Sequence, residues 1–207
     1  MIRIGLFAAV ALAGGSLPYI TALLPLQQFM NEAEVIVEGV IESADAEKKT
    51  CVVKVTKSHK GKSPYTHIRI DIGAAPSDWK RDGAVKHYVA GARAVLFYKN
   101  DPYRKATWRG QIYVNRFFCP LIVKKDEPPE TAVWKWDGLE IHLNRTYNRP
   151  AEELSALVSA VLLGKAKAPA PDPKVPEIGK EDLLALPLPG VKVADEKLPA
   201  AFRKGGP

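Results

Sequence analysis

Two short groups of basic and aromatic residues have the side-chain chemistry expected of a binding surface. Lysine and arginine attract anions, and a neighbouring aromatic ring can stack on a ligand or on the cation itself. Both groups fall in segments expected to be loops, where binding residues are common. The sequence therefore indicates two candidate binding loops, with ordinary solvated loops as the alternative. Their members are Lys57, His59, Lys60, Lys62 and Tyr65 in the first group, and Tyr103, Arg104, Lys105, Trp108 and Arg109 in the second.

Motifs for catalysis or metal binding are absent from the sequence. The four histidines, His59, His67, His87 and His142, show no spacing such as H-E-x-x-H, and there is no Cys-x-x-Cys pair. The chain also has no G-x-S-x-G elbow, phosphate-binding loop or dinucleotide glycine motif. We therefore expect no metal site, no cofactor and no catalytic residue. An enzyme whose site assembles from scattered residues, such as His67 and Asp71 on one strand face, is the alternative.

The chain has two cysteines, Cys51 and Cys119. In an oxidising compartment such a pair can form a disulfide. Cys51 alternates with Val53 and Val55 on one face of an expected strand, where a free thiol packs well as a small apolar side chain. A disulfide and two separate buried thiols are both compatible with the sequence.

The amino terminus has the pattern of an export signal. Arg3 precedes a run from Ile4 to Met30 without a charged side chain, and Gly14, Gly15 and Pro18 interrupt it. We predict that residues 1–26 are a signal peptide or an N-terminal membrane anchor. Both remain open because the residues near Ala13 and Ala22 do not match a typical A-x-A cleavage motif. The folded part is then extracytoplasmic, either secreted or periplasmic, and residues 4–26 tether it to the membrane if they are not removed.

The net charge of +7 favours anionic partners. We expect a protein, an anionic envelope polymer or a lipid surface, while export disfavours nucleic acid. Membrane contact is expected only through the N-terminal segment, if that segment is not cleaved. The basic residues are scattered along the chain, so a charge that only maintains solubility is the alternative.

Alternating apolar and polar residues predict six to eight short strands between residues 31 and 164. Gly39 lies inside the first strand, where a glycine predicts a bulge or a sharp bend. The turn signal Asp137-Gly138 predicts a hairpin between the last two strands. The expected strands are Glu34 to Ser43, Thr50 to Lys57, Thr66 to Ile72, Ala92 to Lys99, Gln111 to Cys119, Leu121 to Lys124, Val133 to Trp136 and Leu139 to Leu143.

One amphipathic helix and a proline-rich tail follow the strands. Pro150 and the acidic Glu152 and Glu153 mark the start of a helix over 150–163, and Gly164 marks its end. The segment 165–207 holds eight of the seventeen prolines, so we expect a tail that mostly lacks fixed structure. Within it, Asp182 to Leu188 is apolar and either docks a partner or lies back on its own domain.

Two segments resemble a known family. The stretch A-E-V-I-V-E-G-V-I from Ala33 and the stretch V-V-K-V-T-K-S-H-K-G from Val52 to Gly61 resemble the OB-fold barrels similar to tissue inhibitors of metalloproteinases and netrin modules. The resemblance covers residues 34–97 and implies a small closed or partly open β-barrel. Animal inhibitors of this kind act through an amino-terminal cysteine, which this chain lacks, so the resemblance does not extend to inhibition.

These patterns predict a mainly β protein: an OB-like barrel over residues 31–164, one C-terminal amphipathic helix and a disordered proline-rich tail. The predicted strands and helix form a scaffold, and the sequence shows no catalytic motif. We therefore favour an exported, non-catalytic binding module that engages a protein or an anionic envelope polymer through barrel loops. An extracytoplasmic hydrolase is the alternative.

Overall fold

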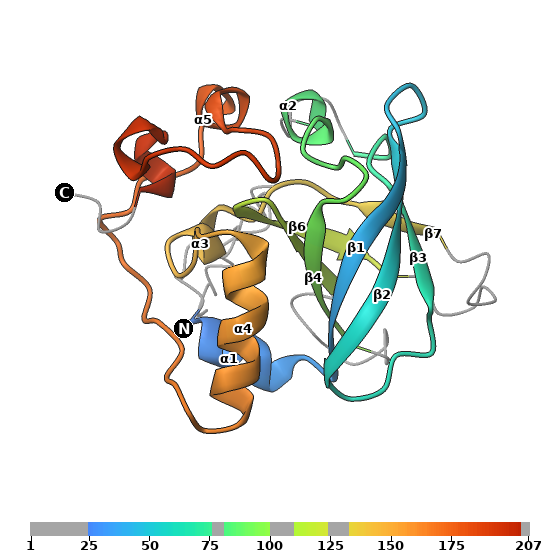
Figure 1. The fold of residues 1–207 in the computed structure, drawn as a ribbon, viewed down its shortest axis with the longest axis vertical. Helices are drawn as coiled ribbons and strands as arrows, with labels where there is room; N and C mark the ends of the chain where they lie inside the picture. Colours follow the sequence, from blue (N-terminus) through green and yellow to red (C-terminus); the bar gives the residue numbers. More distant parts are fainter. Residues whose placement is uncertain (1–24, 76–80, 100–109, 124–132, 204–207) are drawn as a thin grey trace, which may run out of the picture.

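A computed structural model describes residues 25–75, 81–99, 110–123 and 133–203. Within these ranges seven strands close into a barrel in the order β1-β2-β3-β7-β6-β5-β4, with β4 pairing back to β1 (Figure 1). Neighbouring strands are antiparallel except for the parallel pair β3 and β7. The mainly β barrel is thus confirmed. The strands are β1 (Val35–Asp45), β2 (Thr50–Lys60), β3 (His67–Asp71), β4 (Arg93–Tyr98), β5 (Gly110–Val114), β6 (Phe117–Ile122) and β7 (Val133–Trp136).

The first strand shows how the alternation of side chains builds two apolar surfaces. Val35, Val37 and Ile41 belong to the cluster inside the barrel, while Ile36 belongs to a second cluster on the outside. The register with β2 shifts between Glu38 and Gly39, which confirms the predicted irregularity at the glycine. The barrel therefore needs cover on its outer face as well as a filled interior.

Large aromatic side chains and both cysteines fill the barrel. Trp134 and Trp136 are fully buried, and Trp136 donates a hydrogen bond from Nε1 to the Tyr88 hydroxyl over 3.0 Å. Cys51 and Cys119 are buried free thiols, and burial raises the pKa of each to about 12. The structure thus shows the arrangement with two separate thiols rather than the disulfide.

Three helices cover the outer face of the barrel: α1 (Leu26–Glu32), α3 (Ile141–Asn144) and α4 (Ala151–Leu162). In Figure 1, α1 and α4 lie side by side next to the barrel. Phe29 of α1 and Leu154 of α4 share one cluster with Phe97 and Phe118 of the barrel. The predicted terminal helix is confirmed as α4. Leu26, placed at the end of the leader by sequence, is fully buried in this cluster. No helix in the described ranges is long and apolar enough to span a membrane, and residues 1–24 lie outside those ranges.

The expected strand Leu139 to Leu143 is wrong, because α3 occupies its second half. Glu140 forms an isolated bridge to Phe118, and its carboxylate then accepts a hydrogen bond from the His142 backbone N–H over 2.8 Å. This cap satisfies an N–H group at the start of the helix. Leu143 is buried in the outer cluster, so the helical turn directs an apolar side chain onto the barrel.

The chain after α4 returns to the barrel, and this differs from the expected flexible tail. The returning segment, residues 165–203, contains α5 (Lys180–Ala185) and two short 3-10 helices, η2 (Asp195–Lys197) and η3 (Ala200–Phe202). Leu183, Leu198 and Phe202 are at most 1% exposed and join the interior cluster. The segment docks in spite of its prolines, because burial of these apolar side chains stabilises the docked conformation. The stretch Asp182 to Leu188 thus lies back on its own domain.

Hydrogen bonds from His87 and Asn115 hold α5 and the residues after it at one end of the barrel. Figure 1 shows α5 beside α2 (Arg81–Val85) at this end. The His87 ring, which is fully buried, donates from Nε2 to the Leu183 carbonyl over 3.0 Å. Its Nδ1 accepts from the Asn115 amide, which also donates to the Pro187 carbonyl, each over 3.0 Å. Burial lowers the pKa of His87 to about 4, so the ring is neutral near pH 7.

Replacing Gly39 by alanine tests the close approach of β1 and β2. A Cβ at this position would lie 2.6 Å from Val53 Cγ1 and 2.7 Å from the Lys54 carbonyl oxygen. We expect the free energy of unfolding to fall by about 1–3 kcal/mol in urea titrations. Gly83→Ala in α2 is the control, since its nearest neighbour would be 3.8 Å away. Equal stability of the two variants would contradict the packing described for Gly39.

Protonation of His87 should weaken docking of the returning segment as the pH falls. The folded pKa of about 4 lies below the ordinary value of 6.5, so the contribution is full above pH 6.5 and is lost between pH 6.5 and 4. The shift corresponds to about 3 kcal/mol. Urea titrations across this range should show a smaller loss of stability for His87→Gln than for the wild type. Parallel pH profiles for the two proteins would be inconsistent with a buried neutral His87.

Candidate functional site

The first predicted binding loop is mostly part of strand β2, and its basic residues face other parts of the chain. Lys60 donates from Nζ to the carbonyl oxygens of Met30 and Asn31, each over 2.9 Å, and thereby holds the end of α1. Burial lowers the pKa of Lys60. Tyr65 packs edge-on against Trp134 at a ring distance of 5.3 Å. Lys57 and Lys62 are exposed, and Lys57 donates from Nζ to Ser159 Oγ over 3.3 Å.

His59 takes part in a buried polar network between the barrel and α4. Its Nε2 lies 3.1 Å from Ser155 Oγ and its Nδ1 lies 2.9 Å from Ser159 Oγ. The Ser155 hydroxyl donates to Glu38 Oε2 over 2.5 Å, and Arg93 donates to Glu38 Oε1 over 2.5 Å. Four elements, β1, β2, β4 and α4, therefore meet at one carboxylate.

The hydrogen bonds and burial of this network determine the protonation states of Glu38 and His59. Burial by itself raises the pKa of Glu38, but the hydrogen bonds from Ser155 and Arg93 reverse this, so the pKa is lowered overall. For His59, burial and the nearby Lys57 ammonium lower the pKa, and Glu38 only partly opposes them. The network thus contains a carboxylate and a neutral imidazole at neutral pH.

The order of groups in the network does not suit nucleophilic catalysis. In a serine triad the histidine stands between the hydroxyl and the acid and accepts the hydroxyl proton. Here Ser155 stands between Glu38 and His59, and its proton points to Glu38. Both groups are also largely buried, since the His59 side chain is 1% exposed and Ser155 is 5% exposed. We interpret the network as a structural one whose hydrogen bonds hold α4 on the barrel.

The second predicted group, Tyr103, Arg104, Lys105, Trp108 and Arg109, lies outside the described residues. Of the residues behind the enzymatic alternative, His67 is half-exposed and lies 3.3 Å from Glu42. No group of three His, Cys, Asp or Glu residues suited to a metal ion is found within the described ranges.

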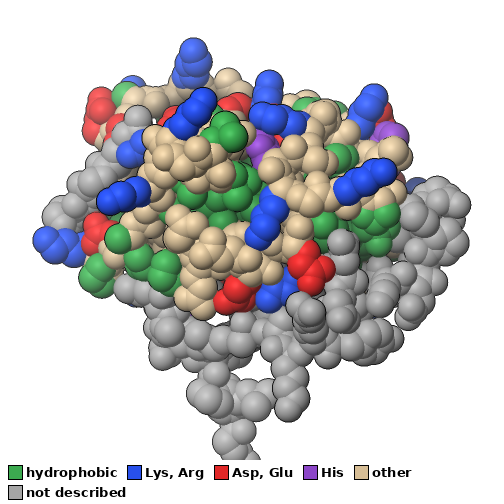
Figure 2. Space-filling model, turned by 90° about the horizontal axis from the view of Figure 1, so that it is seen from below, with side chains coloured by type: hydrophobic (Ala, Val, Ile, Leu, Met, Phe, Trp, Pro, Cys, Tyr) green, Lys and Arg blue, Asp and Glu red, His purple; other side chains and the backbone are tan. Residues whose placement is uncertain are grey.

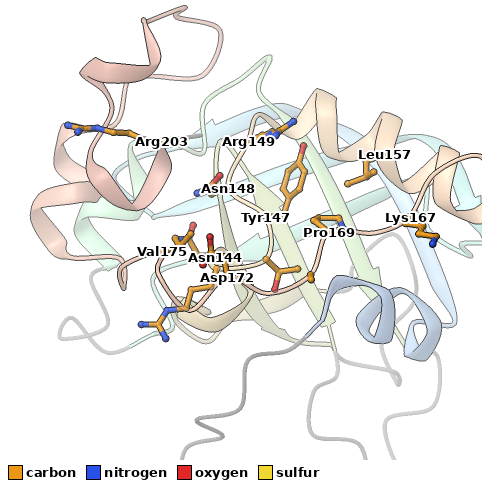
Figure 3. Close-up of a pocket in the computed structure, with 13 residues that line it drawn as sticks. Asn144, Tyr147, Asn148, Arg149, Leu157, Lys167, Pro169, Asp172, Val175 and Arg203 are labelled. Carbon is orange, nitrogen blue, oxygen red and sulfur yellow. The ribbon is translucent and has the colours of Figure 1, made fainter. Parts of the chain in front are cut away.

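A pocket of about 320 Å³ opens where the returning segment crosses the connection between α3 and α4 (Figure 3). One wall belongs to residues 144–149 and to Leu157 of α4, and the other belongs to residues 167–175 and Arg203. The residues that line it are Asn144, Arg145, Thr146, Tyr147, Asn148, Arg149, Leu157, Lys167, Pro169, Ala170, Asp172, Val175 and Arg203.

Cations surround this pocket. Among the described residues, its lining contains Arg145, Arg149, Lys167 and Arg203 but only one acid, Asp172. The partners of the first two are distant, because Arg145 lies 3.8 Å from Glu177 and Arg149 lies 3.8 Å from Glu153. The Arg149–Glu153 pair is exposed, and an exposed ion pair of this length contributes little and leaves the cation able to attract a ligand. Figure 2 shows a face of the protein on which Lys and Arg side chains recur around apolar patches.

The sequence contained a signal for one wall of the pocket. The stretch Arg145-Thr-Tyr-Asn-Arg149 combines charge with an aromatic residue, as the two predicted loops do. No sequence pattern predicted the other wall. Arg203 joins Arg149 in the lining of the pocket only because the C-terminal segment returns to the barrel. Neither His67 nor His142 is among the lining residues of this pocket.

Comparisons with protein-family models, with curated proteins and with solved structures give no match for this chain. The function is therefore inferred from the geometry of the site.

Replacing Ser155 by alanine tests whether the polar network fastens α4 or serves a site. Glu38 loses a donor and His59 loses a partner inside the fold, so we expect a loss of about 1–3 kcal/mol in the free energy of unfolding. Ser43→Ala, on an exposed part of β1, should change stability by less than about 0.5 kcal/mol. A Ser155→Ala protein as stable as the Ser43→Ala control would refute the fastening role.

Proposed function

We propose that this protein is an exported, non-catalytic binding module that engages an anionic polymer of the cell envelope. The observation that carries the proposal is the pocket with four cationic side chains and one carboxylate in its lining. Such a rim attracts negative charge and raises the local concentration of an anionic ligand. The net charge of +7 acts in the same direction at longer range.

Export is the second part of the proposal. Its support is Arg3 followed by the uncharged run from Ile4 to Met30. The buried position of Leu26 adds a constraint on processing. A cut at Ala22 would leave α1 on the folded part, whereas a cut after Leu26 would remove a side chain that packs in the outer cluster.

A relation to netrin-like modules is the third part. The barrel is consistent with an OB-like fold, and its first strand is irregular at Gly39 within the stretch that carries the resemblance. Binding in such barrels is commonly carried by loops at the barrel mouth. The candidate pocket instead lies beside the barrel, under the returning segment, so its ligand does not follow from the fold.

Binding to an immobilised acidic polysaccharide tests the proposal. The wild type should bind polygalacturonate and not neutral dextran, and raising the salt concentration should weaken binding because the attraction is electrostatic. Arg149→Glu with Arg203→Glu should weaken binding at least about tenfold in low salt. The matched control, Arg69→Glu with Lys135→Glu, makes the same charge change on exposed positions of β3 and β7.

Retention of the wild type on dextran as strongly as on polygalacturonate would argue against an anionic ligand. An equal loss of affinity in the site variant and in the control variant would show that only the net charge matters.

A further inference from the structure

We propose that the ligand is an extended acidic sugar chain that contacts both walls of the pocket at once. This inference rests on the proposed function and adds the ligand class and the way in which it is held. Three features of the described residues support it: the origin of the two walls, the directions of the cations and the chemistry of the surface between them.

The two walls come from parts of the chain that are far apart in sequence. Arg145 and Arg149 belong to the connection between α3 and α4, whereas Lys167 and Arg203 belong to the returning segment. Polar contacts between described residues join the walls near the pocket. The Asp172 backbone N–H donates to the Arg145 carbonyl over 2.8 Å.

Hydrogen bonds also join the end of the returning segment to the connection between α3 and α4. The amides of Asn144 and Asn148 both donate to the Ala201 carbonyl, over 3.2 Å and 2.9 Å. Arg203 donates from Nε to the Leu198 carbonyl over 2.7 Å, and the two terminal nitrogens of its guanidinium, which have no hydrogen-bond partner among the described residues, can bind a ligand. A ligand that contacts Arg149 and Arg203 together would therefore add a link between the walls.

The cations do not converge on one point. In Figure 3 the side chains of Arg203 and Lys167 lie on opposite sides of the pocket, and Arg149 lies between them along one edge. A single phosphate or carboxylate cannot contact all three cations, because anion contacts require hydrogen-bond distances of about 3 Å. A chain with repeated negative charges can contact them in sequence, and its affinity then rises with length.

The surface between the cations suits sugar rings. Tyr147, Leu157 and Pro169 provide apolar contact for the C–H faces of a ring. Asn144 also lines the pocket, near Val175 and Asp172 in Figure 3; it is 1% exposed, and its Oδ1 accepts no hydrogen bond within the described part of the chain. Buried acceptors are normally satisfied, so this atom is suited to a hydroxyl donor. The carboxylates of an acidic polysaccharide would meet the cations, and its hydroxyls would meet the amides.

Isothermal titration of the full chain with galacturonate and with hexagalacturonate tests this inference. We expect the hexamer to bind at least about a hundredfold more tightly than the monomer, because it links separate cations. Bound hexamer should also slow hydrogen exchange of the amides in residues 179–202, since it ties the returning segment to the barrel domain. Polyphosphate of equal charge should bind at least about tenfold more weakly, because it has no sugar ring.

Single variants on each wall complete the test. Arg149→Glu and Lys167→Glu should each lower hexamer affinity about tenfold and remove the added protection of residues 179–202, while Arg69→Glu should do neither. Lys167 and Arg69 are exposed, so these two variants should keep the fold.

Equal affinity for monomer and hexamer would overturn the extended ligand but leave the binding function intact. Tighter binding of polyphosphate would overturn the sugar assignment alone. Absence of binding to hexagalacturonate, to polygalacturonate and to polyphosphate would contradict the proposed function itself.

Discussion

Docking of the returning segment against the barrel is the interaction on which the candidate site depends. Leu183, Leu198 and Phe202 enter the interior cluster, and each large apolar side chain contributes about 1.5–3 kcal/mol when fully buried. His87 and Asn115 add directional bonds that fix where α5 lies. Without this docking one wall of the pocket would be missing.

The polar groups of the chain divide into two kinds with different roles. Glu38, His59 and Ser155 are buried and satisfy one another, which orders α4 on the barrel. Arg149 and Arg203 lie at the surface. Arg149 forms a long ion pair with Glu153, and Arg203 donates one hydrogen bond to the Leu198 carbonyl. Buried polar groups specify the structure, whereas the surface cations remain free to attract a partner. This division explains why a histidine and two serines lie close together without forming a reactive site.

Much of the barrel could be predicted from the sequence, because alternation along each strand reports which face is buried. The strand containing Ile68 and Ile70 shows this most directly. The site could not be predicted in the same way, because it depends on tertiary contacts between distant segments. His59 and Lys60 have the composition of a binding loop, yet the helices that cover them follow only from the packing. The prolines of residues 165–203 suggested flexibility, but the buried Leu183 and Phe202 decide the outcome.

Binding of an anionic polymer across the two walls of the pocket can be mapped by NMR. The measurement follows backbone chemical-shift changes during titration with hexagalacturonate. We expect the largest changes in residues 144–149 and, together with them, in residues 167–175 and around Arg203. Changes centred instead on Lys62 and the turn between β2 and β3, with the pocket unaffected, would contradict binding across the two walls.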